Sequence, residues 1–171
     1  MPGRERNLEI KAVDADPQAT LAAALSFGAE DQGVLHQRDT YFHAVTGRLK
    51  LREAPPRPAE LIAYARADLA GPKVSHYRVV PVADHLALID ALTDSRGVRC
   101  VVEKARHLLR WRNVRIHLDR VAGLGHFVEL EAVATSPGGL EVERERVEQL
   151  RATLGIADEQ LIAQGYADLL A

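Results

Sequence analysis

The sequence has few of the features that mark secreted, membrane-spanning or cysteine-stabilised proteins. Its single cysteine, Cys100, excludes an internal disulfide and a cysteine-rich zinc site. No apolar run at the N-terminus resembles a signal peptide, and no stretch approaches the roughly 20 apolar residues that cross a membrane. The net charge is only −2, so no overall field favours nucleic acid or an anionic membrane. We therefore expect a cytoplasmic protein with neither nucleic acid nor a membrane as its partner.

The composition is that of a folded chain. Of the 171 residues, 47% are hydrophobic and 27% are charged, which suits a packed soluble protein rather than a disordered one. This length is enough to bury a substantial core, and it favours a single domain over residues 1–171.

The stretch VRIHLDRVAGLGHFVELE, residues 114–131, predicts two strands joined by a glycine-bearing turn. Side chains alternate between the faces of a strand. Asp119 on the first strand can therefore gather with Glu129 and Glu131 of the second on one surface of a hairpin. Carboxylates that lie close together resist ionisation unless a cation lies among them. A hard divalent cation is the natural occupant of such a surface.

Alternation of polar and apolar residues predicts strands along most of the chain. The clearest run is RLKLR, in which Arg48, Lys50 and Arg52 share one face. About eight strands with three or four helices indicate a mostly antiparallel α+β fold. The expected strands are residues 7–13, 37–42, 48–52, 60–68, 73–80, 98–105, 114–119 and 126–131, with a proline-rich loop at 54–58 and helices at 16–28, 84–92, 141–154 and 158–170.

The polar faces of these strands carry concentrated Arg, Lys and Glu. Such faces are either open to water or enclosed in a barrel whose interior is charged and wet. An interior with both signs of charge suits a polyanion bound together with a metal, because cations hold phosphate oxygens and carboxylates hold the bridging ion.

Four motifs in a fixed order resemble the CYTH superfamily, the triphosphate tunnel metalloenzymes. They are EIK at residues 9–11, GRLKLR at 47–52, EKAR at 103–106 and LDRVAGLGHFVELE at 118–131, and the closing YADLL extends the likeness. The resemblance implies an eight-stranded antiparallel β-barrel that forms a charged tunnel with flanking helices. The barrel strands would occupy about residues 5–135 and the C-terminal helices about 140–171.

The resemblance also implies roles for individual residues. Oxygen-only ligands favour Mg2+ or Mn2+ over zinc. Asp119 could instead orient an arginine, and His117 could contact substrate or metal or simply form part of the wall. Solvated ion pairs are the alternative for every charged residue. The expected metal ligands are Glu9, Asp119, Glu129 and Glu131; the expected substrate ligands are Lys11, Arg48, Lys50, Arg52, Arg66, Arg78, Lys104, Arg106 and Arg115, of which Lys11, Lys104 and Arg106 are the catalytic candidates.

Two positions depart from the family pattern. The family signature begins Glu-x-Glu-x-Lys, and here Asn7 stands at its first position, which offers a neutral oxygen but no charge. This change would leave one firmly held metal ion or make a second ion depend on substrate oxygens. Arg66 stands where class IV cyclases usually have a lysine, which keeps the charge but changes the geometry of phosphate binding.

The family includes class IV adenylyl cyclases and thiamine triphosphatases, and the GLGHFVELE run is closest to the cyclase-like branch. We therefore expect a triphosphate compound, ATP or tripolyphosphate, as the partner and cyclic AMP with pyrophosphate as the first-ranked products. Hydrolysis of an inorganic or organic triphosphate is the second reading. A non-catalytic binder of triphosphorylated ligands, with Asn7 as the reason for lost activity, is the third. Both a monomer and a homodimer are compatible with the sequence.

Overall fold

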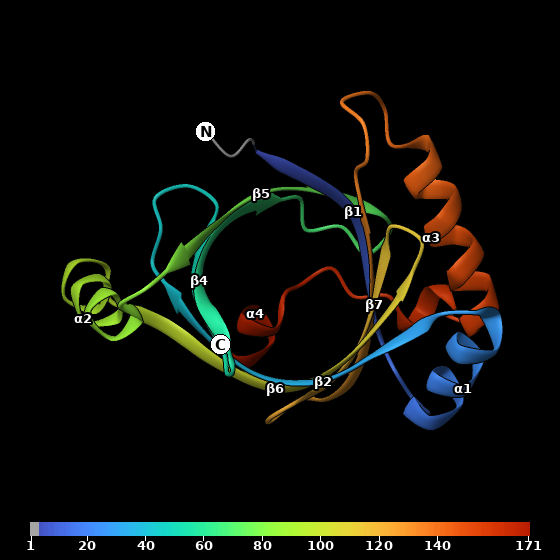
Figure 1. The fold of residues 1–171 in the computed structure, drawn as a ribbon, viewed down its shortest axis with the longest axis horizontal. Coiled ribbons are helices and arrows are strands. Elements are labelled where there is room, and N and C mark those ends of the chain that lie inside the picture. The colour runs from blue at the N-terminus through green and yellow to red at the C-terminus, as the bar shows by residue number, and fades with distance from the viewer. Residues whose placement is uncertain (1–3) are drawn as a thin grey trace.

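The computed structural model describes residues 4–171, in which eight antiparallel strands form a closed barrel (Figure 1). The strand order around the barrel is β1-β5-β4-β3-β2-β6-β7-β8. This closed arrangement confirms the predicted barrel and leaves no strand edge unpaired. The strands are β1 (Glu5–Val13), β2 (Glu30–Phe42), β3 (Arg48–Ala54), β4 (Arg57–Arg66), β5 (Lys73–Val82), β6 (Val98–Trp111), β7 (Val114–Val121) and β8 (Gly125–Val133).

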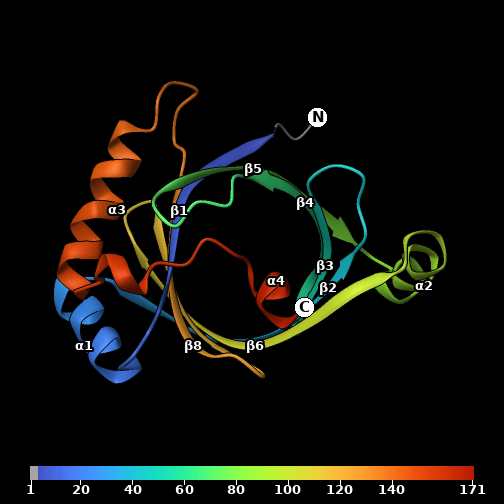
Figure 2. The same ribbon diagram turned by 180° about the vertical axis from the view of Figure 1, so that it is seen from behind.

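The helices α1 and α3 pack against one side of the barrel and α2 against another, while α4 lies inside the ring of strands (Figures 1 and 2). Helix α1 begins as predicted, because the Asp16 side chain accepts a hydrogen bond from the Ala19 amide. It ends at Gly28, whose φ of 105° is open to glycine without strain. The helices are α1 (Pro17–Phe27), α2 (His85–Arg96), α3 (Glu141–Leu154) and α4 (Tyr166–Leu170), with a 3-10 turn at Asp158–Gln160.

The main hydrophobic core lies outside the barrel, beneath helices α1 and α3. The outward-facing side chains of β1, β7 and β8, such as Ile10, Ile116 and Leu130, are almost fully buried there against Val147 and Leu150 of α3. Burial of this aliphatic layer removes it from water and fixes which face of each strand points inward. The alternating polar residues are thereby committed to the interior of the barrel.

Strands β2 and β6 exceed their predicted bounds by the largest margins. Strand β2 begins at Glu30, ahead of the expected start, and β6 continues to Trp111 through a segment expected to be a turn. The two strands pair with each other along most of this length, including Glu30 with Arg110. Pairing with a long neighbour supplies the ladder hydrogen bonds, so these segments are strands despite their irregular alternation.

The expected proline-rich loop is shorter than predicted. Ala54 at the end of β3 pairs with Arg57 at the start of β4, so only Pro55 and Pro56 form the turn. Helix α2 is also longer than the sequence indicated and ends at Arg96. Helical spacing would place Leu86 on the buried side of α2, but this residue is 64% exposed.

The prediction of one helix over residues 158–170 is wrong. After the 3-10 turn the chain is extended, forms a bridge between Leu161 and Ala12 of β1, and then enters the barrel as α4 (Figure 2). The Ile162 amide donates to the Lys11 carbonyl, and the Arg66 guanidinium donates to the Ala163 carbonyl. These tertiary hydrogen bonds replace those that a continuous helix would have made. Among residues 4–171, no helix is long and apolar enough to span a membrane.

Candidate active site in the barrel

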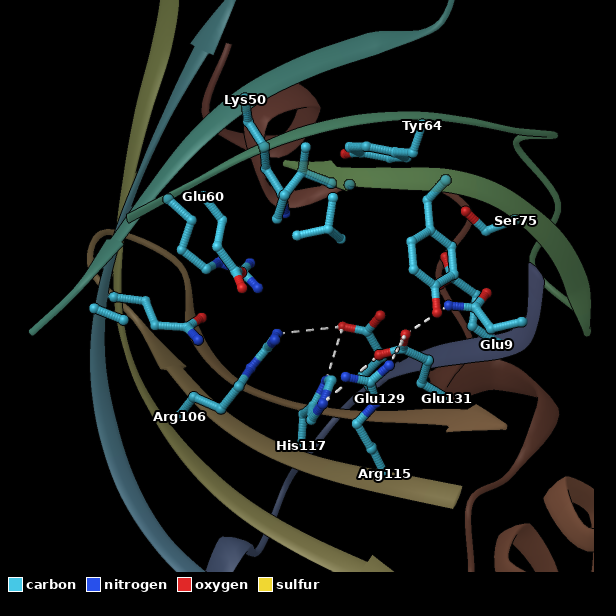
Figure 3. Close-up of a pocket in the computed structure, with 18 of the residues that line it drawn as sticks. Glu9, Lys50, Glu60, Tyr64, Ser75, Arg106, Arg115, His117, Glu129 and Glu131 are labelled. Carbon is cyan, nitrogen blue, oxygen red and sulfur yellow. Dashed lines mark hydrogen bonds and ion pairs between the residues drawn. The ribbon is translucent and has the colours of Figure 1, made fainter. Parts of the chain in front are cut away.

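The inward-facing side chains of all eight strands line a cavity of about 450 Å3 (Figure 3). Both signs of charge are present. The enclosed, charged interior, one of the two alternatives that the alternation left open and the one that the family resemblance implied, is therefore confirmed. The cations in its lining are Lys11, Lys50, Arg52, Arg57, Arg66, Lys104, Arg106 and Arg115, and the carboxylates are Glu5, Glu9, Glu60, Glu129 and Glu131.

One cluster combines an imidazole with two carboxylates. His117 of β7 lies between Glu129 and Glu131 of β8, and one ligand atom from each residue lies within 4.8 Å of the other two (Figure 3). The His117 Nδ1 atom is 3.8 Å from Glu129, and its Nε2 atom is 3.7 Å from Glu131. Burial and the neighbouring Arg106 lower the pKa of His117, so its imidazole is neutral near neutral pH. Neutral imidazole is the form that binds metals.

Cations surround the two carboxylates of this cluster. Burial alone would raise the pKa of Glu129, but Lys11, His117 and Arg106 hold it well below its usual range. Glu131 accepts a hydrogen bond of 2.6 Å from the Asn7 side-chain amide and is 3.4 Å from Arg115. Glu129 and Glu131 are therefore ionised at neutral pH and available to a cation.

Glu9 has a different environment from the cluster carboxylates. It is 3.3 Å from the Arg66 guanidinium, an ion pair that the sequence did not predict. Burial raises the pKa of Glu9, and the charges of Glu129 and Glu131 raise it further, to about 7. Glu9, Glu129 and Glu131 thus lie together at one side of the cavity. A bound cation would reduce the repulsion between them.

Asp39 is a fully buried carboxylate that holds three of the predicted phosphate ligands. It accepts two hydrogen bonds from Arg52, at 2.8 and 2.7 Å, and one each from Lys50 and Lys104. Burial alone would raise the pKa of Asp39, but Arg52, Lys104 and Lys50 hold it well below its usual range. One negative charge against three positive charges leaves a local excess that suits an anion.

Asp119 orients an arginine, which is the alternative that the sequence left open. Each of its two oxygens accepts a hydrogen bond of 2.8 Å from Arg106. One of them also accepts a hydrogen bond of 2.7 Å from the Tyr166 hydroxyl. Asp119 is 2% exposed and does not line the cavity. The expected role of Asp119 as a metal ligand is therefore not supported, because its oxygens are already engaged.

Tyr166 of α4 forms the closed end of the cavity. The Lys11 ammonium lies 3.9 Å from the centroid of its ring, and that of Lys104 lies 5.2 Å away. Phe127 packs against the same ring with 5.1 Å between centroids. These contacts hold both lysines at the deep end, where burial lowers the pKa of Lys104 well below its usual range.

The opposite end of the cavity has a partly aliphatic rim, in which Arg57 lies beside Ala54 and Glu60 beside Pro81. Strand β3 begins at Arg48, which is paired with Asp168 of α4, and ends at Ala54, which lines the far rim. Exposure of the charged side chains rises from 2% for Lys104 through 8% for Arg106 to 42% for Arg115. The aliphatic lining consists of Leu35, Ala54, Pro58, Ile62, Val79, Pro81 and Leu108.

Two of the expected substrate ligands do not line the cavity. Arg78 is exposed on the opposite face of β5 from Ser75 and Tyr77, which do line it. Arg48 lies beyond the closed end, where it pairs with Asp68 and Asp168. The remaining seven expected ligands all contribute to the lining.

Sequence reasoning missed the roles of Asp39 and Tyr166. The alternation of Gln37, Asp39 and Tyr41 places all three on one face of β2, and this signal could have assigned Asp39 to the interior. Nothing local could have placed Tyr166, because its contacts depend on where the C-terminal segment enters the barrel.

The family model of the CYTH domain matches residues 5–166. The chain belongs to this family. CYTH proteins act on triphosphate compounds. This protein is therefore an enzyme that acts on a triphosphate, and both adenylyl cyclase and triphosphatase reactions are compatible with the match. No functionally curated protein matches the chain.

Solved structures share the fold at low sequence identity. PH1012 from Pyrococcus horikoshii has a TM-score of 0.84 and 21% identity, over 95% of this chain and 98% of that protein. A candidate adenylate cyclase from Vibrio parahaemolyticus has a TM-score of 0.79 and 18% identity, over 98% and 99%. HpAC1 from Hippeastrum, a candidate adenylyl cyclase described with a dominant triphosphatase activity, has a TM-score of 0.66 and 14% identity, over 97% and 93%. At these identities the likeness establishes the fold.

The residues present fit the divalent metal that the family implies. Glu129 and Glu131 supply hard oxygen ligands and His117 a nitrogen. Two polar atoms beside them, Asn7 Oδ1 and His117 Nδ1, are buried without a hydrogen-bond partner. Buried polar atoms are normally paired, so these atoms indicate space for a bound group.

Proposed function

We propose that this protein is a divalent-metal-dependent enzyme of the class IV adenylyl cyclase type, which converts ATP to cyclic AMP and pyrophosphate. The order of side chains along the cavity supports this proposal. Lys11, Lys104 and Arg106 lie at the closed end, the His117–Glu129–Glu131 cluster begins beside Arg106, and the partly aliphatic rim lies at the open end. A nucleoside triphosphate has the same order of chemistry along its length.

The deep cations would bind the terminal phosphates. Lys11, Lys104 and Arg106 would neutralise the charge that develops on departing pyrophosphate, with Lys50 and Arg52 holding it from the other wall. Asp39 and Asp119 would keep these cations in place, because each is buried and hydrogen-bonded to them.

The nucleoside would occupy the partly aliphatic rim, since apolar side chains there offer contact to a base or sugar. This orientation brings the phosphorus next to the ribose beside Glu129 and Glu131. A divalent cation bound there would polarise that phosphorus and activate the attacking 3′-hydroxyl. The cluster extends from Arg106, which lies 3.5 Å from Glu129, to Arg115, which lies 3.4 Å from Glu131. Ring closure is the outcome expected when the nucleoside lies at the rim, because the ribose then lies next to the cluster.

Hydrolysis of an inorganic or organic triphosphate is the second candidate. The number of cations at the closed end favours it, because they suffice to hold a triphosphate that has no organic group. The cluster would then serve attack by water rather than by a ribose hydroxyl.

Product analysis separates these functions. Purified protein with Mg2+ or Mn2+ is offered ATP and tripolyphosphate separately, and the products are resolved by chromatography. Cyclic AMP with pyrophosphate is the expected result. Orthophosphate from either substrate would replace the proposal with the hydrolase, and saturable binding without turnover would make the protein a triphosphate binder.

A further inference from the structure

The two nitrogens of His117 lie at distances from carboxylates that a hydrogen bond does not explain. The separations of 3.8 Å to Glu129 and 3.7 Å to Glu131 exceed the usual 2.7–3.2 Å of a hydrogen bond. Two ligand atoms bound to one small divalent ion at about 2.1 Å lie about 3–4 Å from each other. One imidazole nitrogen binds one ion, so the relevant spacing is that of a single ligand atom from each residue. These three atoms lie within 4.8 Å of one another, which is close enough for one ion to gather them after small side-chain rotations.

The polar atoms around the cluster also lack partners within the described residues. His117 is 4% exposed and its Nδ1 atom has no hydrogen-bond partner. Asn7 is 3% exposed, and its Oδ1 atom has none either, although its amide nitrogen donates to Glu131. Leaving such atoms unpaired is costly, so both observations point to a ligand among them.

The other acidic residues of the predicted metal group lie outside this cluster. Arg66 lies 3.3 Å from Glu9, and Arg106 with Tyr166 engages both oxygens of Asp119. Asn7 supplies no charge where the family pattern has a glutamate. Glu129 and Glu131 also lie near arginines, at 3.5 Å from Arg106 and 3.4 Å from Arg115, but they have the nitrogen donor His117 within 4.8 Å.

We propose that His117 is a direct nitrogen ligand of the metal in the cavity, together with Glu129 and Glu131, and that this set selects Mn2+ over Mg2+. Mg2+ prefers oxygen ligands and gives up water reluctantly, whereas imidazole suits first-row transition metals. The inference deepens the proposed function and rests on it only in requiring that a divalent cation binds in the barrel.

Pulsed electron paramagnetic resonance of bound Mn2+ tests this directly, because a coordinated imidazole couples its 14N nucleus to the metal. Tag-free protein is measured with Mn2+ alone and with Mn2+ plus a non-reacting α,β-methylene analogue of ATP. The variants are His117→Gln and, as a matched control, His107→Gln, whose imidazole pairs with Asp31 on the outer surface. Calorimetry gives the Mn2+ and Mg2+ affinities of each protein.

We expect 14N coupling in the unaltered protein and in His107→Gln, and its loss in His117→Gln. The Mn2+ affinity should fall by at least about tenfold in His117→Gln, since even outer-shell partners contribute about this much to metal affinity. The Mg2+ affinity should fall less, because Mg2+ prefers oxygen ligands. Bound Mn2+ without 14N coupling, or coupling that persists in His117→Gln, would overturn the inference and leave the proposed reaction untouched. Failure to bind Mn2+ in either condition would overturn it as well. Coupling without cyclic AMP formation would uphold the inference and remove the proposed function.

Discussion

The Tyr166 hydroxyl donates a hydrogen bond of 2.7 Å to the Asp119 carboxylate, although the two residues are 47 positions apart in the sequence. The same carboxylate holds Arg106 through two hydrogen bonds. The C-terminal segment therefore does more than close the barrel: through Asp119 it helps to fix a cation of the candidate active site.

Replacing this tyrosine by phenylalanine isolates the hydroxyl. We expect Tyr166→Phe to lower the free energy of unfolding by about 2 kcal/mol, because a hydrogen bond to a buried charge is lost. The ring remains, so its contacts with Lys11 and Lys104 persist and the Michaelis constant should change little. Urea unfolding and steady-state kinetics measure both. Tyr166→Ala, which also removes the ring, should raise the Michaelis constant clearly; equal kinetics in the two variants would contradict a role for the ring.

Asp39→Asn removes the negative charge shared by three cations. We expect the free energy of unfolding to fall by about 3–5 kcal/mol, because Lys50, Arg52 and Lys104 are left buried or half-buried without their counter-charge. Tripolyphosphate should then raise the melting temperature of Asp39→Asn more than that of the unaltered protein, since it supplies the missing charge.

The control for this change is Asp68→Asn. Asp68 pairs with Arg48, but its side chain is 58% exposed, so its loss should change stability by less than about 1 kcal/mol. An unfolding midpoint of Asp39→Asn equal to that of Asp68→Asn would show that the buried charge has no structural role.

Glu129→Gln removes one charge from the cluster and keeps the side-chain shape. We expect metal-dependent turnover to disappear while the circular dichroism spectrum stays that of the unaltered barrel. Glu103→Gln is the matched control, because Glu103 pairs with Arg38 and is 57% exposed. If Glu129→Gln turned over substrate as fast as Glu103→Gln does, the cluster carboxylates would have no part in the reaction.

Glu9 makes the stability of the metal-free protein depend on pH. Its pKa is raised from 4.5 to about 7, so the folded state holds this proton more tightly than the unfolded state. Its contribution is therefore fully present below about pH 4.5 and is lost as the pH rises through about 7, by up to about 3 kcal/mol.

Unfolding with a chelator present, at pH 5 and at pH 8, measures this loss. The difference between the two pH values should be larger in the unaltered protein than in Glu9→Gln, which cannot ionise. A pH dependence identical in both proteins would show that Glu9 does not carry the raised pKa.

The local sequence pattern was sufficient to place much of the candidate site. Alternation in the RLKLR run puts Lys50 and Arg52 on the face that lines the cavity, and the hairpin of β7 and β8 forms with Glu129 and Glu131 directed inward. These assignments need only the two-residue period of a strand and a buried opposite face. Arg78 was also expected among the substrate ligands, but it lies on the outer face of β5.

The pattern of polar and apolar residues was therefore enough to identify the strands and the charges that each strand carries. Which charges meet depends on how the strands are arranged in the barrel. Asp119 holds Arg106, Arg66 pairs with Glu9, and Asp39 gathers three cations from neighbouring strands. The physical reason is that a two-residue period fixes the face of each side chain but not the stagger of the strands around a closed barrel. The path of the C-terminal segment also depends on the barrel, because its hydrogen bonds with Lys11 and Arg66 can form only once the strands are assembled.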